Sequence, residues 1–498
     1  MKKILFAVVI ACIPFGVFAQ QMLGPIGDKT PISIGVIDGK TPVFSYAEEA
    51  LGQFLYTTKY YVSFGGEISG PYEECSLLTF SSDGKAFAYN ATIDGKRYIV
   101  TGKDKIGPFT LCSEPMFSPH DNTLTYMVEI DGKWYVVYGK DKFGPYDNSG
   151  ELMFTPDGKT LTYTMEINGK WYVFVGTEKA GPFDMCGELT FSPDGKTLAY
   201  KGMVNEKWYV YAGNEKYGPF TDCYWLTFFP NSSTPIFMAN TDGFWYVVSG
   251  KEKLGPYNNT AYLYPSPDGK TLVYMAEIDG KWYVVAGNEK AGPYDEYGEL
   301  LFSKDGKTLA YAASTGGEWY VFNGKDKAGP YDTAYSLVMP PDGKFLAYIA
   351  TIDGLSYVIN GKEKTGPYDT CAEIMVSPDG ETLVYVAELG ESWYVFSGKD
   401  KAGPYRYCGE LTFSHDGKKL AYSAFIDDKW YIVDGKNRIG PYDTCGFLDY
   451  SLDGKVLTFQ ADINGESYNK VMIDGKAYTG SIVNNEVVYI DNGNLMKK

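Results

Sequence analysis

Glutamate side chains recur along this sequence at a fixed distance from Gly-Pro dipeptides, and they are the first candidates for chemistry. They lie seven residues after the Gly of a Gly-Pro pair at Glu114, Glu151, Glu188, Glu299, Glu373 and Glu410. A row of carboxylates near one mouth of a channel would attract cations or a basic peptide, and the alternative is a solvated acidic rim.

Cysteines occupy a second fixed position, two residues before the glutamates: Cys75, Cys112, Cys186, Cys223, Cys371, Cys408 and Cys445. Other repeats carry Ser149, Thr260, Tyr297 or Ala334 there. Since Ser, Thr and Ala are small, a limit on side-chain size explains the position better than pairing does. An odd number of cysteines cannot all pair within one chain. The spacing also lacks a C-x-x-C zinc arrangement. We therefore expect free, buried thiols and no metal site.

Catalytic signals are weak. The only histidines are His120 and His415, and both replace residues of a turn sequence. No G-x-S-x-G nucleophile motif occurs. The Pro-Asp-Gly turns lack the alternating carboxylates of a calcium loop. The sequence predicts no catalytic residues and no cofactor.

These residues are positioned by a strict internal repeat. Gly-Pro recurs every 37 residues, with glycines at 70, 107, 144, 181, 218, 255, 292, 329, 366, 403 and 440. A fixed period of this length indicates a repeat architecture. With a degenerate first copy, twelve repeats fill residues 38–481, and a tail follows at 482–498, where a closing strand is expected.

Each repeat contains three breaks between short β-branched and aromatic runs. Ser192-Pro193-Asp194-Gly195 is typical of a hairpin turn, and Asp131-Gly132 is a type I′ signal. A third break, Gly-Lys-Asp/Glu-Lys, precedes the Gly-Pro-Tyr segment. The mature chain shows no helical period. The prediction is an all-β protein of four-stranded antiparallel meanders whose last strand is short.

Tryptophan occupies one repeat position at 134, 171, 208, 245, 282, 319, 393 and 430, and tyrosine follows it in every repeat. Neighbouring residues of a strand point to opposite faces. Stacked sheets are covered on both faces, so we expect these rings in the core. The alternative is one sugar-binding ring per repeat.

The segment F-S-P-D-G-K-x-L-A-Y resembles the WD40-like repeat called PD40, found in TolB-type periplasmic propellers. It is strongest at 154–163, 191–200 and 413–422, and it weakens at 228–237. The resemblance implies β-propeller blades but no specific partner or activity. Because twelve blades exceed the usual number, two six-bladed rings at 38–259 and 260–481 are the leading arrangement. A single large ring or an open stack are the alternatives.

Several residues that depart from the repeat pattern lie in neighbouring copies of the repeat. Trp225 and Tyr262 replace glutamate in two consecutive repeats. Nearby departures are Tyr224, Tyr264, Tyr297 and Tyr335. We expect an aromatic surface spanning adjacent blades, and the alternative is local repacking.

The N-terminus predicts export. Lys2 and Lys3 precede an apolar run, and Val17-Phe18-Ala19 precedes Gln20, which indicates a signal peptide at 1–19 and a lead-in at 20–37. Cys12 leaves lipoprotein anchoring as the alternative. No later segment is long and apolar enough to span a bilayer. A net charge of −17 without a basic cluster argues against nucleic-acid binding.

The sequence therefore predicts a non-catalytic, extracytoplasmic scaffold, periplasmic or secreted, in a bacterial-type cell envelope. It would bind a protein or peptide. The alternative is a multivalent propeller that binds carbohydrate or cell wall.

Overall fold

The computed structural model describes residues 21–22, 31–37, 41–51, 56–64, 67–76, 78–451, 453–463, 466–473, 476–483, 486–491 and 494–497. All regular structure in these ranges is β-strand. They contain no helix of the length and apolarity that a membrane span requires. The predicted signal peptide and Cys12 lie outside the described residues.

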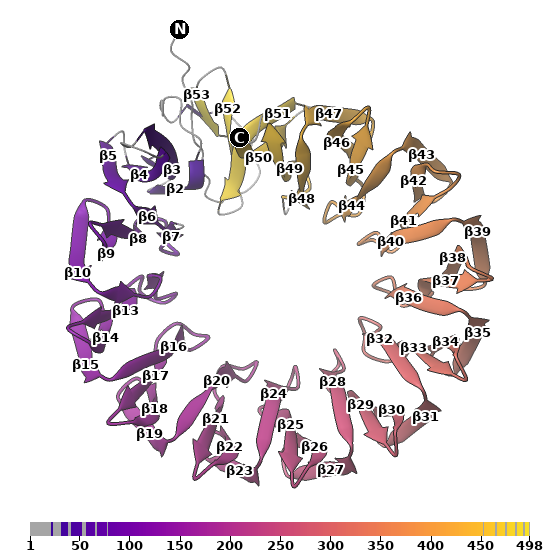
Figure 1. Cartoon of the computed structure of the whole chain (residues 1–498), viewed down its shortest axis with the longest axis horizontal. Coiled ribbons are helices and arrows are strands. Elements are labelled where there is room, and N and C mark those ends of the chain that lie inside the picture. Colours follow the sequence, from indigo (N-terminus) through magenta and orange to yellow (C-terminus); the bar gives the residue numbers. More distant parts are fainter. Residues whose placement is uncertain are drawn as a thin grey trace. The chain divides into compact units, whose positions relative to one another are not determined.

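The described strands form twelve sheets, and all but the last of these sheets are built from consecutive strands of the chain (Figure 1). One representative sheet consists of β28 (Asn259–Pro265), β29 (Leu272–Ile278), β30 (Lys281–Ala286) and β31 (Glu289–Tyr294), hydrogen-bonded in that order. Each pair in it is antiparallel. The all-β fold of four-stranded antiparallel meanders is confirmed.

The other sheets repeat this pattern along the chain. They span 31–72, 74–109, 111–146, 148–183, 185–220, 222–257, 296–331, 333–368, 370–405 and 407–442. In the sheets at 74–109 and 111–146 the first strand is split in two. The last sheet, from β48 (Thr444–Tyr450) to β53 (Asn494–Lys497), also contains β1 (Gln21–Met22). The two ends of the described chain are thus paired, with Met22 opposite Met496.

The chain divides into two compact units. The first comprises Met1–Gly169, Val173–Lys179 and Lys429–Lys498, and the second comprises Lys170–Tyr172 and Ala180–Asp428. Strand β2 (Pro31–Ile37) lies in the segment predicted as a lead-in. The grouping of repeats into rings at 38–259 and 260–481 stays a prediction.

The turns between strands follow the local sequence. Asp131 and Gly132 both have positive φ, 51° and 74°, which confirms the type I′ hairpin. The prediction of a short last strand is wrong, because β30 and β31 both have six residues. The third break is a two-residue turn, Gly287-Asn288, since Ala286 pairs directly with Glu289.

The hydrophobic core lies between successive sheets. Ile236 and Val247 of one sheet form a buried cluster with Tyr274 and Ala276 of the next. Because a sheet is covered on both faces, its second strand is buried along most of its length, as in β29.

Tyrosine hydroxyls add a polar contact to these interfaces. The hydroxyls of Tyr294 and Tyr311, on successive sheets, lie 2.9 Å apart. Burial and the Tyr294 hydroxyl raise the pKa of Tyr311. Equivalent hydroxyl pairs join Tyr257 to Tyr274 and Tyr368 to Tyr385. Each of these tyrosine hydroxyls thereby has a partner, as burial of a polar group favours.

The tryptophan row contributes to the core but is not its deepest layer. Trp245, Trp282 and Trp319 are half-buried and pack against buried clusters. Two residues further along the same strands, Val247 and Val284 are almost completely buried. The prediction that these tryptophans belong to the core is confirmed for the three residues above.

Candidate functional site

In the repeats at 148–442, where the first strand is continuous, the glutamate position lies at a β-bulge in that strand. In β20 (Met185–Phe191) the pairing with β21 (Leu198–Val204) shifts between Gly187 and Thr190. Glu188 and Glu410 have φ of 54°, which is uncommon for residues other than glycine. A bulge of this kind redirects the side chain at its extra residue.

Two of the predicted glutamates tie successive sheets together. The Glu299 carboxylate accepts hydrogen bonds from the backbone N–H groups of Ser336 (3.1 Å) and Leu337 (2.7 Å). Glu373 accepts from the N–H groups of Glu410 (2.9 Å) and Leu411 (3.0 Å). These carboxylates of one repeat therefore satisfy donors at the bulge of the next.

The other glutamates have different surroundings. Glu188 forms an ion pair with Lys201 at 2.9 Å. The backbone N–H of Glu151 donates to the Thr164 hydroxyl at 2.8 Å. Glu114 is exposed and lines a cavity. The row is therefore chemically heterogeneous, although its members share one repeat position.

Three of the predicted aromatic residues form one cluster. The rings of Tyr262 and Tyr264 are stacked with centroids 5.9 Å apart, and Tyr297 contacts Tyr262 edge-on at 5.5 Å. Tyr297 also packs on Trp282 at 4.5 Å. Tyr264 is 42% exposed. The cluster thus has an exposed edge and a base packed into the sheets.

Trp225 lies at the same repeat position as Tyr262, on the preceding sheet. It is 47% exposed, and its φ is 62°. Its neighbour Tyr224 packs on Trp245, with centroids 4.9 Å apart. Tyr335 is half-buried, and its hydroxyl donates to the carbonyl of Cys371 at 3.2 Å. The six predicted residues therefore include both exposed rings and rings used in packing.

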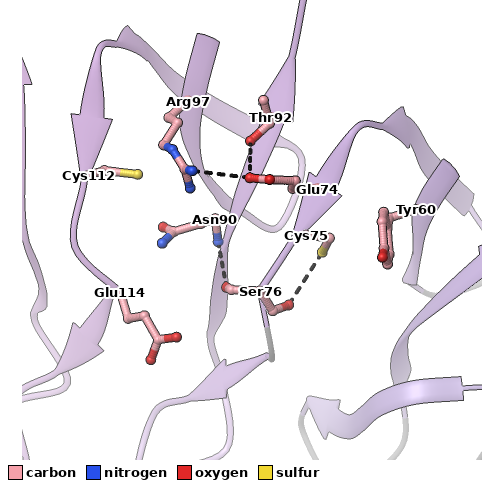
Figure 2. Close-up of a pocket in the computed structure, with 9 residues that line it drawn as sticks. All are labelled: Tyr60, Glu74, Cys75, Ser76, Asn90, Thr92, Arg97, Cys112 and Glu114. Atoms are coloured by element: carbon pink, nitrogen blue, oxygen red, sulfur yellow. Dashed lines mark hydrogen bonds and ion pairs between the residues drawn. The ribbon is translucent and has the colours of Figure 1, made fainter. Parts of the chain in front are cut away.

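Two further residues stand out that the sequence patterns did not single out. Phe447 occupies the glutamate position and is 79% exposed. Arg97 occupies the tryptophan position and lines a cavity of about 440 Å³ (Figure 2). An alignment of the repeats would show both residues as departures from the residue type that most repeats carry at that position.

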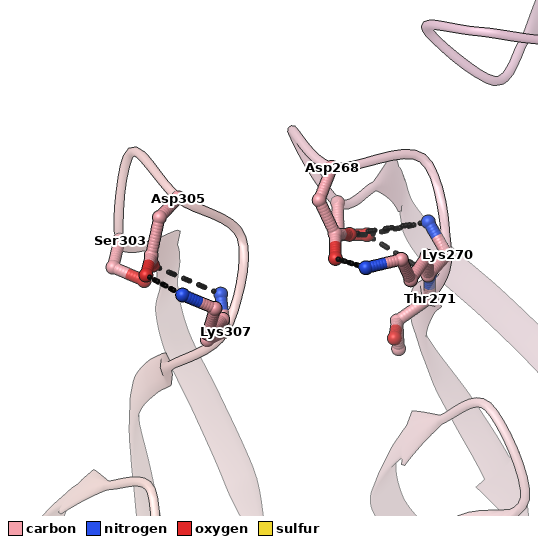
Figure 3. A network of polar contacts seen from close by, with 7 residues as sticks. Asp268, Lys270, Thr271, Ser303, Asp305 and Lys307 are labelled. Atoms are coloured by element: carbon pink, nitrogen blue, oxygen red, sulfur yellow. Dashed lines mark hydrogen bonds and ion pairs between the residues drawn. The ribbon is translucent and has the colours of Figure 1, made fainter.

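The aspartates of the Ser-x-Asp-Gly turns, which include the Pro-Asp-Gly turns, form hydrogen bonds within the turns (Figure 3). Asp305 accepts hydrogen bonds from the Ser303 hydroxyl (2.7 Å) and from the backbone N–H and ammonium of Lys307 (3.2 and 2.8 Å). A Cβ on Gly306 would lie 2.8 Å from the backbone nitrogen of Asp268, in the preceding turn. The turns therefore stabilise the fold, as predicted for a turn-forming aspartate.

Acid should weaken these turns. The hydrogen bonds from Lys307 and Ser303 hold the pKa of Asp305 at about 2, and that of Asp121, bonded to Ser118 and Thr123, is also about 2. The unfolded value is about 3.9. A carboxyl group whose pKa is lower in the folded than in the unfolded protein stabilises the fold at a pH above its unfolded pKa. This stabilisation is lost as the pH falls through its folded pKa. We expect the melting temperature to fall between about pH 4 and pH 2, and to fall less steeply in the D121N/D305N variant. Equal slopes would contradict this assignment.

The cysteines are free thiols in the described residues. Burial raises the pKa of Cys371 and Cys408 to about 12. Burial also raises the pKa of Cys112 to about 11, although Arg97 acts in the opposite direction. Since the thiolate is the reactive form, these thiols should be poor nucleophiles at neutral pH.

Alkylation tests this expectation. With iodoacetamide at pH 8, the native protein should react at least tenfold more slowly at Cys371 and Cys408 than the urea-unfolded chain, as counted by mass spectrometry of peptides. Equal rates in the two states would contradict burial of these thiols.

The described residues contain no group of three His, Cys, Asp or Glu side chains arranged to hold a metal ion. His120 lies in a turn, where its backbone nitrogen would be 2.7 Å from a Cβ on Gly158. Its backbone N–H donates to the Ser118 hydroxyl at 3.2 Å. The contacts of its backbone are therefore those of a turn residue.

Known structures resemble this chain only at low sequence identity. No family model matches this chain, and no curated protein matches it. Many solved structures are similar, and three of them are described below. The structure of the Dos1 propeller is 13% identical, covering 65% of this chain and 92% of its own, with a TM-score of 0.27. Oligogalacturonate lyase in complex with manganese is 11% identical, covering 55% and 96%, with a TM-score of 0.27. The putative TolB from Agrobacterium tumefaciens is 16% identical, covering 40% and 83%, with a TM-score of 0.24.

Identities this low say nothing about activity or partners. The fold itself rests on the repeated four-stranded antiparallel sheets and on the packing between them. The chain is an all-β repeat protein whose sheets are blades of the β-propeller type.

Proposed function

We propose that this chain is a non-catalytic scaffold that binds a protein or peptide through the aromatic surface formed by Trp225, Tyr262 and Tyr264. The exposure of Trp225 and Tyr264 is the observation that carries the proposal. Large aromatic side chains dominate protein interfaces because they bury much apolar area at a low cost in conformational entropy.

The local backbone supports this assignment. Trp225 and Tyr262 occupy bulge residues with φ of 62° and 52°. They share this conformation with Glu188 and Glu410, so the bulge directs a large ring where those repeats direct a carboxylate. At the same position in two other repeats, the carboxylates of Glu299 and Glu373 accept hydrogen bonds from the next sheet, and Trp225 and Tyr262 have no carboxylate.

The location belongs to the proposal as well. Lys2, Lys3 and the apolar run after them support export to an extracytoplasmic space, periplasmic or secreted, in a bacterial-type envelope. Anchoring through Cys12 is the alternative. Membership of the PD40 family is likewise proposed on the repeat sequence.

The multivalent carbohydrate alternative would use the tryptophan row. Trp245, Trp282 and Trp319 pack against buried clusters, so their faces are largely occupied. This packing favours a single protein-binding surface over one sugar site per repeat.

Capture from an envelope fraction tests the proposed surface. Immobilised wild-type protein should retain a partner, and the W225E/Y264E variant should retain at least tenfold less of it. Both rings are exposed, so their loss removes the binding surface and leaves the core intact. F447E is the matched control, since Phe447 lies at the same repeat position and is also exposed. Equal capture by W225E/Y264E and the wild type would refute the surface, and so would unfolding of that variant.

A further inference from the structure

We propose that the cavity beside Arg97 binds a neutral, polyhydroxylated ligand of the size of one or two sugar units. The cavity is lined by residues of three successive sheets: Tyr60, Glu74, Cys75, Ser76, Asn90, Thr92, Arg97, Cys112 and Glu114. Its volume of about 440 Å³ is within the range of small-molecule sites. The inference goes beyond the proposed function and does not depend on the aromatic surface.

The cavity is associated with one departure from the repeat. In the sheet at 296–331, Trp319 packs so closely that a Cβ on Gly298 would lie 3.3 Å from its ring. Arg97 stands at the equivalent position and turns its guanidinium towards Glu74, at 3.1 Å. The volume that a tryptophan ring would fill is thereby left to a ligand.

A second departure at this position has a different outcome. Ser356 also replaces tryptophan, but there the hydroxyl of Tyr335 forms a hydrogen bond with Ser356. The residue equivalent to Tyr335 beside Arg97 is Ser76, which is too small to fill the space. Loss of the tryptophan is therefore compensated by a neighbouring ring in one repeat and not in the other.

The cavity wall contains a polar atom that lacks a partner. Asn90 is 8% exposed, and its amide nitrogen donates to the Ser113 carbonyl at 3.1 Å. Among the described residues its Oδ1 atom has no hydrogen-bond partner. In Figure 2 the Asn90 side chain points between Cys112 and Glu114. A buried acceptor without a donor is unfavourable. Because the Oδ1 atom is enclosed, the Asn90 side chain must turn towards the cavity before a ligand hydroxyl can supply the donor.

The charges of the wall favour a neutral ligand. Glu74 pairs with Arg97 and also accepts from the Thr92 hydroxyl at 3.3 Å. Glu114 adds a second carboxylate, and the whole chain carries −17, so an anion is repelled. A cation would meet the guanidinium of Arg97.

Adjacent hydroxyl groups match the wall better than a charge does. Each hydroxyl both donates and accepts. The Arg97 guanidinium can donate to a hydroxyl beside its contact with Glu74, and the Glu74 carboxylate and the Asn90 Oδ1 atom can accept from hydroxyls. The ring of Tyr60 adds an apolar surface for the carbon skeleton of a sugar.

Binding of defined sugars tests the proposal. Glucose, galactose, mannose, N-acetylglucosamine and maltose would each be titrated into the full chain and followed by calorimetry and saturation-transfer NMR. We expect at least one to bind and to slow alkylation of Cys112. Absence of binding by all five, or tighter binding of glucuronate or of lysine amide, would overturn the proposal.

Two variants that restore residues from other repeats locate the site. Arg97→Trp should fold, because eight repeats carry tryptophan there, and it should weaken sugar binding at least 100-fold. Asn90→Met introduces the residue that other repeats carry at this position, as at Met127, Met238 and Met275. It should weaken sugar binding about tenfold, as expected for the loss of one hydrogen bond. Glu151→Gln is the control at the Glu114 position and should bind as the wild type does. Unchanged binding in R97W and N90M would refute the site.

The two proposals fail separately. W225E/Y264E should keep sugar binding, and R97W should keep partner capture. Loss of both activities in R97W with an unchanged melting temperature would mean that the cavity belongs to the partner site, and it would refute an independent sugar site.

Discussion

Replacing Gly292 by alanine should destabilise the protein by about 2–4 kcal/mol, one of the largest effects expected of a single methyl group here. A Cβ at this position would lie 2.8 Å from Cδ1 of Tyr283 and 2.9 Å from the carbonyl oxygen of Trp282. The φ of Gly292 is 134°, which side chains rarely adopt. Thermal unfolding by calorimetry measures the loss.

Gly280→Ala is the matched control for this prediction. Gly280 has a φ of 72°, but a Cβ there would meet nothing within 4 Å. The change should cost only about 1 kcal/mol, the left-handed penalty alone. If both variants lost the same stability, the contact of Tyr283 with the Gly-Pro segment would not be the cause.

The Gly292 contact recurs because the repeat recurs. A Cβ on Gly255 would lie 2.9 Å from the Tyr246 ring, and one on Gly403 would lie 2.6 Å from the Tyr394 ring. Lys253 and Lys401 place their ammonium groups over the same rings, at 3.7 and 3.5 Å from the centroids. In these repeats the tyrosine is thus held between a glycine and a cation.

Glu373→Ala should lower stability by about 1–3 kcal/mol, because it removes two charge-assisted hydrogen bonds. The two donors are the N–H groups of Glu410 and Leu411 on the next sheet, and Leu411 is buried. Urea unfolding measured by tryptophan fluorescence detects the change.

Glu114→Ala provides the comparison for Glu373. Glu114 occupies the same repeat position but is exposed at the cavity, so its loss should change stability by less than about 0.5 kcal/mol. Equal losses in the two variants would mean that the position acts through charge alone, without the bonds to the next sheet.

The acidic row shows why the site was only partly predictable from sequence. The spacing identifies Glu299 and Glu373 as equivalent, and their side chains do make equivalent bonds. The row was predicted as a collar or a solvated rim, because a spacing does not reveal which backbone donors lie opposite a carboxylate. That depends on how the next sheet is placed.

The aromatic residues show the same limit. Sequence marks Tyr264 and Tyr335 alike as departures from the repeat. In the structure Tyr264 is exposed, whereas Tyr335 is half-buried and bonded to the Cys371 carbonyl. The exposure of a side chain depends on how much space its neighbours in the folded protein leave around it. The residue type at one repeat position does not give this information.

The sequence by itself determined the strands, their antiparallel order and the turns, because hairpin chemistry such as Asp131-Gly132 is local and a uniform stride of 37 residues repeats it. Only the tertiary structure decided which carboxylates bind the next sheet and where a missing tryptophan leaves a cavity. The physical reason is that these outcomes depend on distances between successive sheets, which packing sets and local sequence does not.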